Sequence, residues 1–222
     1  MEDGKLMINI LYEDNHLLVV EKKPNIPVQL DDSNDEDLLS ILKKYLKEKY
    51  QKPGNVYLGL VHRLDRPVGG VMVFAKTCKA SSRLSKQIRN QVFEKEYFAV
   101  LEGNIVQEKG ILKDKLLKNS KTNTTKVDKN GKEAVLEYEL VSSKNNLSLV
   151  KVNLITGRSH QIRVQFSSRG YPLYGDQRYN KNAKKVQIAL YATKLAFYHP
   201  ITNEKLTFEI KIPNRYPFTI FK

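Results

Sequence analysis

The chain has 222 residues, of which 41% are hydrophobic and 28% are charged, so it can build the core of one globular domain. Its 38 lysines and arginines exceed its 24 aspartates and glutamates, and the formal net charge of +14 favours a polyanionic partner over a surface that is basic for solubility alone. No apolar run reaches the roughly 20 residues of a membrane span, one cysteine excludes an internal disulfide, and four scattered histidines disfavour a zinc site. We expect a single cytoplasmic domain, residues 1–222, that uses neither metal nor cofactor.

The N-terminal segment predicts a pair of strands followed by a helix. A strand from Met7, a turn at Glu13–Asn15 and the apolar run Leu17–Val20 are typical of two paired strands. The acidic run Asp31–Asp37 then precedes apolar residues that are spaced for one helix face over 38–46. Acidic residues stabilise the N-terminal end of a helix, so we interpret this run as capping and not as a metal site.

The next segment predicts a turn, a strand and a basic helix. An apolar stretch over 58–64 leads into the turn Asp65–Gly70 and the strand Val71–Ala75. Thr77 can cap the following helix, which has an apolar stripe along one side. The opposite side carries Lys79, Arg83 and Lys86. These three residues either contact phosphates or form a solvated helix face.

Lysines dominate the segment after the next predicted strand, Phe93–Glu102. Between Lys109 and Lys132, eight lysines accompany two aspartates and many Asn, Thr and Ser residues. We interpret this segment as a mobile basic loop. Its candidate contacts with a polyanion are Lys113, Lys115, Lys118 and Lys121.

The C-terminal half predicts a hairpin, a short helix and closing strands. The runs Ala134–Val141 and Leu147–Leu154 flank a Lys-Asn-Asn turn and are typical of a hairpin. A short helix is expected within Gly157–Ser168, and strands are expected over Ala189–Tyr198 and Lys205–Ile212. The chain therefore predicts an α+β fold with a mixed, largely antiparallel sheet and flanking helices.

Two segments place charged side chains among apolar ones. In His62-Arg63-Leu64-Asp65 a carboxylate precedes a tight turn, where it can act as a nucleophile or base, or merely cap the turn. Arg163 lies between apolar residues of the second segment, and a buried arginine requires a carboxylate to neutralise it. Asp65 is a candidate partner for Arg163.

Four segments together resemble the RluA-type pseudouridine synthases in their order and spacing. They are His62-Arg63-Leu64-Asp65 followed by Gly70, then Lys95–Gly103, Gly157–Arg163 and Tyr171–Asp176. The resemblance extends from Leu11 to Ile212. It implies the pseudouridine synthase fold and an enzyme that isomerises uridine within RNA to pseudouridine, with no cofactor.

The resemblance also implies roles for individual residues. Asp65 matches the catalytic aspartate, Tyr97 the tyrosine that stacks on the base, and Arg163 the basic residue that pairs with the aspartate. Arg63 matches an arginine that enters the space left by a flipped nucleotide. Further candidate substrate contacts are His62, Arg158, His160 and Gln161. Both of these histidines are more typical of a hydrogen-bonded scaffold than of acid or base catalysis.

The chain departs from the family pattern in three respects. Pro67-Val68-Gly69-Gly70 stands where relatives have a Thr-Ser-Gly run, which removes hydroxyl groups near the site. Leu190-Tyr191-Ala192 stands where relatives often have Leu-His-Ala. No S4 RNA-binding domain precedes the catalytic segments, so we expect this domain alone to hold the RNA.

We expect a monomer that acts on ribosomal or transfer RNA and binds neither DNA nor a membrane. Two alternatives stay open. A uracil-releasing hydrolase would share base flipping and an attacking acid, but it would release the free base. A non-catalytic RNA-binding or ribosome-assembly factor would keep its function without Asp65.

Overall fold

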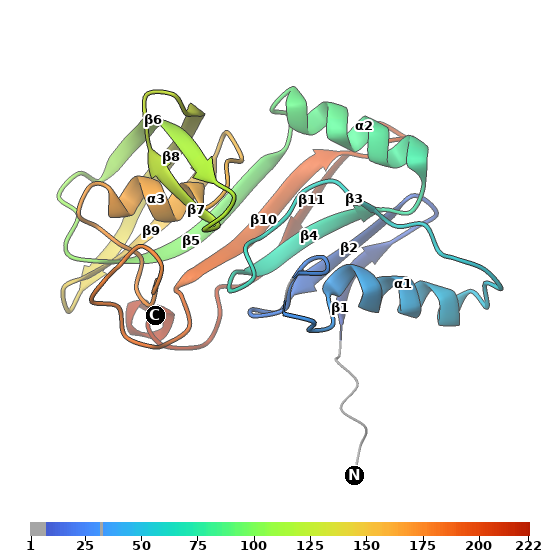
Figure 1. The fold of residues 1–222 in the computed structure, drawn as a ribbon, viewed down its shortest axis with the longest axis horizontal. Coiled ribbons are helices and arrows are strands. Elements are labelled where there is room, and N and C mark those ends of the chain that lie inside the picture. The colour runs from blue at the N-terminus through green and yellow to red at the C-terminus, as the bar shows by residue number, and fades with distance from the viewer. Residues whose placement is uncertain (1–7, 32) are drawn as a thin grey trace, which may run out of the picture. The chain divides into compact units, whose positions relative to one another are not determined.

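The computed structural model describes residues 8–31 and 33–222, which form two compact units (Figure 1). The first unit runs to Val92 and includes Ala196–Phe208, and the second comprises Phe93–Leu195 and Glu209–Lys222. Both combine strands with helices, which confirms the predicted α+β class. No helix in the described part of the chain is long and apolar enough to cross a membrane. Two predicted positions, Met7 of the first strand and Asp32 of the acidic run, lie outside the described residues.

The first unit is built on antiparallel strands whose apolar runs form its core. In chain order its elements are β1 (Asn9–Glu13), β2 (Leu17–Lys22), α1 (Leu38–Lys49), β3 (Gly59–Leu60), β4 (Gly69–Ala75) and α2 (Cys78–Arg89). Strand β2 lies between β1 and β4, and β3 pairs with β4. The side chains of Leu17–Val20 and Met72–Ala75 have no exposed surface. The chain returns to this unit within β10 (Leu190–Tyr198), at Ala196, and leaves it again within β11 (Lys205–Glu209), after Phe208.

Both helices of this unit begin at the residues that the sequence predicts. Asp37 accepts a hydrogen bond from the backbone N–H of Ser40 at 3.1 Å, and Thr77 accepts one from Ala80 at 3.2 Å. These bonds satisfy N–H groups that have no partner within the helix, which is why short polar side chains mark helix starts. The acidic run before α1 therefore supplies a cap, as expected.

The carboxylate of Glu13, at the end of β1, anchors the last turn of α1. Its oxygens accept hydrogen bonds from Tyr45 (2.9 Å), Lys49 (2.8 Å), Tyr50 (2.6 Å) and Lys76 (2.8 Å), and its side chain is only 6% exposed. Burial alone would raise the pKa of Glu13, but these hydrogen bonds outweigh it and lower the pKa from its ordinary value of 4.5 to about 2.

We expect Glu13→Gln to lower the free energy of unfolding by about 3 kcal/mol at neutral pH. Because the pKa of Glu13 is lower in the folded state, its contribution is complete above pH 4.5 and is lost as the pH falls towards 2. Urea unfolding across this pH range measures the effect. The variant should lose less stability with acid than the parent, whereas Glu139→Gln, which removes half of an exposed ion pair, should behave like the parent. Equal acid sensitivity in parent and Glu13→Gln would contradict the assignment.

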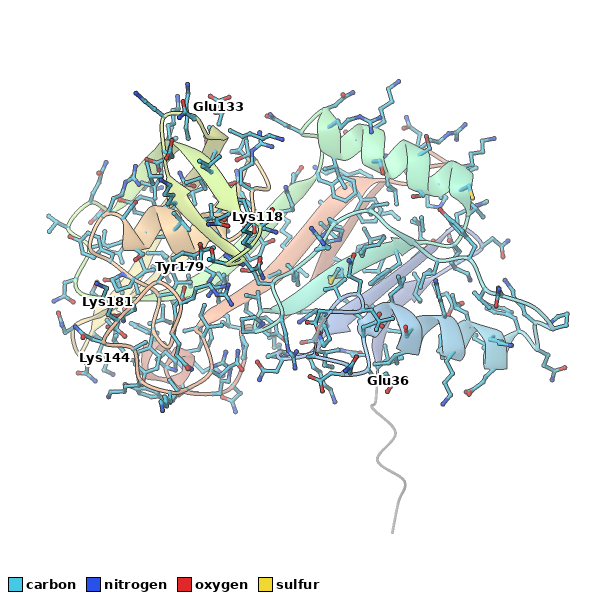
Figure 2. The ribbon with its side chains drawn as sticks, in the orientation of Figure 1. Glu36, Lys118, Glu133, Lys144, Tyr179 and Lys181 are labelled. Carbon is cyan, nitrogen blue, oxygen red and sulfur yellow. The ribbon has the colours of Figure 1, made fainter. Side chains whose placement is uncertain are left out.

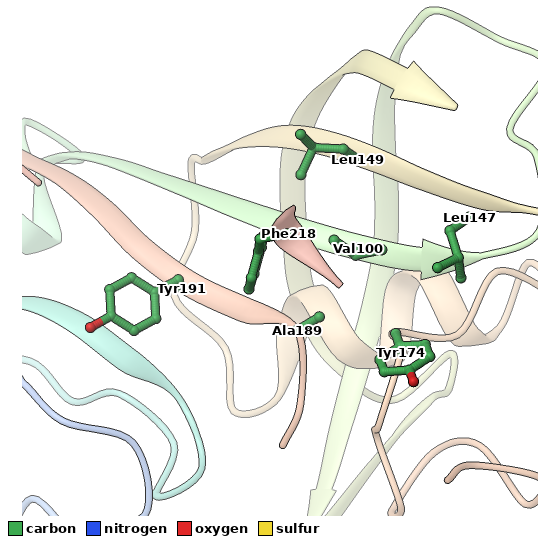
Figure 3. Packing of buried hydrophobic residues seen from close by; sticks show 7 residues of the cluster. All are labelled: Val100, Leu147, Leu149, Tyr174, Ala189, Tyr191 and Phe218. Atoms are coloured by element: carbon green, nitrogen blue, oxygen red, sulfur yellow. The ribbon is translucent and has the colours of Figure 1, made fainter. Parts of the chain in front are cut away.

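The second unit is a longer antiparallel sheet with one helix against it. Its elements are β5 (Glu94–Glu102), β6 (Lys109–Asn119), β7 (Thr124–Val127), β8 (Lys132–Lys144), β9 (Leu147–Leu154), α3 (Gln161–Ser167) and the 3-10 helix η1 (Phe218–Phe221). Its strands follow the order β10-β5-β9-β8-β6-β7. Helix α3 packs against β6 and β7 (Figure 1). Figure 3 shows a core cluster of this unit: Val100, Leu147, Leu149, Tyr174, Ala189, Tyr191 and Phe218.

The basic segment from Lys109 to Lys132 is a hairpin, so the prediction of a mobile loop is wrong. Leu112 and Leu116 alternate with exposed lysines along β6, and both leucines are buried. The amide of Gln165 on α3 donates to the Leu112 carbonyl at 3.2 Å, which ties the hairpin to the helix. An alternating strand pattern was present in the sequence, but its outward positions are mostly lysines, and the high lysine content obscured it.

Other predicted elements are confirmed with shifted ends. The β8–β9 hairpin is longer than predicted, and β11 ends at Glu209. The helix expected within Gly157–Ser168 begins only at Gln161, because the preceding residue, His160, has a left-handed backbone with φ of 53°. That conformation turns the chain into α3 and fixes the direction of the residues on either side.

Candidate active site

Asp65 lies in the first unit, in the loop that joins β3 to β4. The N–H of Val68 donates to the Asp65 carbonyl at 2.9 Å and closes a four-residue turn, as the sequence predicts. Gly69 and Gly70 then begin β4, and Gly70 has a φ of 132°, which favours glycine. Asp65 therefore belongs to a short turn that leads directly into β4, a strand paired with β2.

A buried lysine, Lys22, holds the turn at Asp65 through hydrogen bonds to its backbone carbonyls. Lys22, at the end of β2, has no exposed surface, and its ammonium donates to the carbonyls of Arg66 (2.9 Å), Val68 (2.7 Å) and Lys23 (3.1 Å). Burial lowers the pKa of Lys22 to about 7, although the nearby charge of Asp65 acts to raise it. The local sequence pattern does not predict this role, because nothing in it distinguishes Lys22 from a solvated lysine at a strand end.

The neighbours of Asp65 have separate structural roles. His62 accepts a hydrogen bond at Nε2 from the backbone N–H of Val73 on β4 at 3.1 Å, which fits the scaffold role expected for this histidine. Arg66 forms an ion pair with Asp35 and approaches Asp31 at 3.5 Å. Arg63 is exposed. Arg63 is therefore the most open of the basic residues in this segment, since His62 and Arg66 are only partly exposed.

Tyr97 lies in the second unit on β5, opposite Val152 of β9, and only 7% of its surface is exposed. Because successive strand residues alternate between faces, Tyr97 shares its face with Lys95 and Ala99. The position of the ring is therefore set by a central strand that is paired along its length.

Arg163, on α3, is held by a carboxylate that the sequence analysis did not identify. Its Nε and Nη2 donate to the two oxygens of Asp176 at 2.8 and 2.7 Å, and the two residues are 5% and 1% exposed. Asp176 also accepts from the backbone N–H groups of Arg178 (3.1 Å) and Tyr179 (3.3 Å). The preceding Gly175 has a φ of 75°, and a Cβ there would lie 2.9 Å from the Gln187 carbonyl oxygen. A two-pronged pair of this kind fixes both the charge and the plane of the guanidinium.

Tyr179 connects Arg163 with the basic hairpin. The Arg163 guanidinium lies 5.1 Å from the centre of the Tyr179 ring, within the range of a cation–π contact. The Tyr179 hydroxyl accepts from the Thr125 N–H of β7 at 2.9 Å and lies 2.6 Å from His160 Nδ1. Burial raises the pKa of Tyr179 above its ordinary value of 10.0. Figure 2 labels Tyr179, together with Lys118 of β6, whose strand partner is Thr125.

Gln161 and Arg158 shape the loop that enters α3. The Gln161 side-chain oxygen accepts from the Thr156 hydroxyl (2.8 Å) and the Arg158 N–H (2.9 Å), and its amide nitrogen donates to the Val135 carbonyl (3.1 Å). Gln161 is 3% exposed, and its hydrogen bonds join the loop to Val135 of β8. Arg158 is exposed and donates through Nε to the Glu133 carbonyl at 2.7 Å.

The candidate RNA-backbone residues lie in both units, on α2 of the first and along the β6–β7 hairpin of the second. Lys79 and Lys86 are exposed on α2, whereas Arg83, on the same helix, donates to the Pro200 carbonyl at 2.6 Å. Lys113 and Lys115 lie on the outward face of β6, which meets glutamates of β8: Lys115 pairs with Glu133, and Ile111 with Glu137. Lys118 and Lys121 lie instead at the end of the hairpin, where β6 turns into β7.

The chain is similar to a known protein family in both sequence and fold. The family model described as RNA pseudouridylate synthase matches residues 16–168. A Bacillus subtilis protein named uncharacterized RNA pseudouridine synthase YhcT is 35% identical over 93% of this chain and 69% of its own length. Ribosomal large subunit pseudouridine synthase D of Zymomonas mobilis is 32% identical over 96% of this chain and 71% of its own length. The solved structure of human RNA pseudouridylate synthase domain containing 4 superposes with a TM-score of 0.78 at 22% identity, covering 96% of this chain and 90% of that one, and so shares the fold.

Proposed function

Because the chain belongs to the RNA pseudouridylate synthase family, whose members are isomerases that convert uridine in RNA to pseudouridine, we propose that Asp65 is the carboxylate with which it performs this reaction. The observation that supports this role is the turn around Asp65, which the buried ammonium of Lys22 holds at two carbonyls on its C-terminal side. A reacting group must be held in a defined position, and a turn anchored in this way meets that requirement.

The reaction rearranges bonds without net gain or loss of atoms. The bond between C1′ of the ribose and N1 of uracil breaks, a bond between C1′ and C5 forms, C5 loses a proton and N1 gains one. An ionised Asp65 supplies the electron pair that starts this sequence, as a nucleophile or as a base. The balance requires neither an oxidant nor a second substrate.

Tyr97 and Arg163 assist Asp65 in this proposal. The Tyr97 ring stacks on the uracil while the base is detached, and the strand behind it keeps the ring in place. Arg163 is assigned the role of the basic partner of the catalytic aspartate, and Asp176 holds its guanidinium plane. Both residues belong to the second unit and Asp65 to the first, so the proposal requires residues 1–222 to work as one catalytic domain.

The substrate base must leave its stack before these groups can reach it, at a cost of a few kcal/mol. We assign Arg63 to the space that the base leaves, since its side chain is exposed next to Asp65. His62, Arg158, His160 and Gln161 are assigned to the walls of the substrate site. For the target we propose ribosomal RNA rather than DNA, because a relative carries a ribosomal large-subunit name, and we propose that the protein acts as a cytoplasmic monomer.

Mapping pseudouridines in ribosomal and transfer RNA, with and without the gene, tests the proposed target. The purified protein should then form pseudouridine at the same uridine in an RNA fragment that contains it. Release of free uracil would identify a hydrolase instead. Binding without any change in the RNA would identify a non-catalytic RNA-binding factor.

The tip of the β6–β7 hairpin should contribute more to RNA affinity than its outward face. Each phosphate contact adds roughly 0.7 to the slope of log affinity against log salt for single-stranded RNA. Lys118→Gln with Lys121→Gln should therefore weaken RNA binding and lower this slope by about 1.4. Lys113→Gln with Lys115→Gln should change it less, because glutamates of β8 share their face. Fluorescence anisotropy over a salt series measures RNA binding by the two double variants. An equal effect of the two double variants would mean that the RNA lies along the whole hairpin.

A further inference from the structure

Lys95 is a lysine close to Tyr97 whose charge has no counterpart among the residues that the structure describes. It lies on β5 two residues before Tyr97 and on the same face of the strand, which separates the two positions by about 7 Å. Its side chain reaches the loop before α3. The Lys95 Nζ lies 3.5 Å from the position that a Cβ on Gly157 would occupy. The ammonium therefore lies beside the loop that carries Arg158 and His160, within ordinary contact distance of position 157.

The ammonium of Lys95 is partly removed from water without being compensated. Within residues 8–31 and 33–222 it forms no hydrogen bond or ion pair, and burial lowers the pKa of Lys95. The residue is half-buried, so solvent can still reach it. A desolvated charge without a partner lowers the stability of the folded protein. Such a charge is typical of a residue that binds a ligand.

Two other lysines with little exposed surface show how this chain compensates such charges. Lys22 donates to three carbonyls. Lys76, with 9% of its side chain exposed, donates to Glu13 at 2.8 Å and to the Asp14 carbonyl at 2.5 Å. Lys95 differs from both in having an ammonium that is available to a ligand.

We propose that Lys95 binds a phosphate group of the RNA backbone next to the uridine that Tyr97 contacts. RNA carries one negative charge at each phosphate, and lysine binds phosphate as a compact point charge. Arg158, which follows Gly157 and is exposed, adds positive charge on the same loop. The inference rests on the proposed function for the identity of the nucleic acid and extends it to a residue that positions the strand.

The first test compares Lys95→Met with Lys95→Arg in an RNA-binding assay over a salt series. Lys95→Met should lower the slope of log affinity against log salt by about 0.7, while Lys95→Arg should keep the parent slope. Lys144→Met is the matched control, because Lys144 is an exposed lysine of the same unit at the turn between β8 and β9 (Figure 2), and it should leave the slope unchanged. A parental slope for Lys95→Met would overturn the proposal.

Thermal unfolding separates a binding role from a structural one. Because the ammonium has no partner in the described part of the chain, Lys95→Met should unfold at the temperature of the parent or above it. A Lys95→Met variant that unfolds at a clearly lower temperature than Lys144→Met would mean that the lysine supports the fold, and would contradict the proposal.

A second test locates the phosphate. Replacing one phosphate at a time with an uncharged methylphosphonate, in an RNA fragment around the modified uridine, should weaken binding by the parent at one position next to that uridine. Lys95→Met should be insensitive to the same replacement, since the interaction is already missing. Equal losses for both proteins at every position would exclude a contact by Lys95. These readouts depend on binding alone, so a parent that binds RNA but forms no pseudouridine would refute the proposed function and leave the role of Lys95 to be decided by the slopes.

Discussion

Asp65→Asn should reduce pseudouridine formation on the order of 10⁴-fold or more and leave RNA affinity within about twofold of the parent. Asparagine keeps the size of the side chain and its place in the turn, but it cannot supply an ionised oxygen. The turn itself should survive, because the bonds that hold it run from Lys22 and Val68 to backbone carbonyls. Single-turnover conversion on an RNA fragment that the parent modifies is the measurement.

The matched control for this substitution is Asp35→Asn. Asp35 forms an ion pair with Arg66, the residue after Asp65, so its replacement also removes a negative charge close to the same turn. The pair is exposed, and its loss should change activity little. If both variants form pseudouridine at close to the parent rate, Asp65 is not catalytic. If both lose activity to the same extent, the loss is due to the local negative charge and not to a reacting carboxylate.

Asp176→Asn should lower the free energy of unfolding by about 3–5 kcal/mol, because it leaves the buried guanidinium of Arg163 without its countercharge. Both residues are at most 5% exposed, so water cannot replace the lost oxygen. The same substitution should slow pseudouridine formation by about 10²-fold, since the plane of Arg163 is no longer fixed. Urea unfolding and single-turnover kinetics give the two effects separately.

A double variant distinguishes loss of the ion pair from general damage around Asp176. Asparagine at position 176 can still accept the N–H groups of Arg178 and Tyr179, so Arg163→Met combined with Asp176→Asn removes only the unpaired charge. The double variant should be more stable than Asp176→Asn alone, yet it should stay inactive. A double variant that is less stable than the single would show that the destabilisation comes from the lost backbone contacts. Glu139→Gln, in the exposed pair with Lys109, should leave the free energy of unfolding close to that of the parent.

Short-range features of this fold were predictable because their causes lie close together in the sequence. The cap of α1 joins Asp37 to Ser40, and the cap of α2 joins Thr77 to Ala80. The β8–β9 hairpin follows from alternating residues around a short turn. The one clear error, the basic hairpin, arose because the outward positions of β6 are mostly lysines, so the high charge of the segment obscured its buried leucines.

The candidate site was predictable as a set of residue types but not as a set of partners. The order and spacing of four segments pointed to Asp65, Tyr97 and Arg163, which stay predictions until the variants are made. That Arg163 is held by Asp176 could not be read from either segment, although both had been singled out. Their separation of 13 residues includes a helix end and a glycine turn, whose geometry decides whether the side chains meet.

The sequence by itself determined most of the local elements and the excess of positive charge, and it supplied Asp65, Tyr97 and Arg163 as candidate site residues. Only the tertiary structure decided which lysines are compensated. Lys22 reaches carbonyls 44 and 46 residues away because β2 and β4 are paired, with Lys22 opposite Gly70. Lys95 meets the loop at Gly157 through the folding of the second unit and finds no partner among the described residues. The physical reason is that hydrogen bonds and charge compensation depend on distance in space, and strand order, not sequence separation, sets that distance.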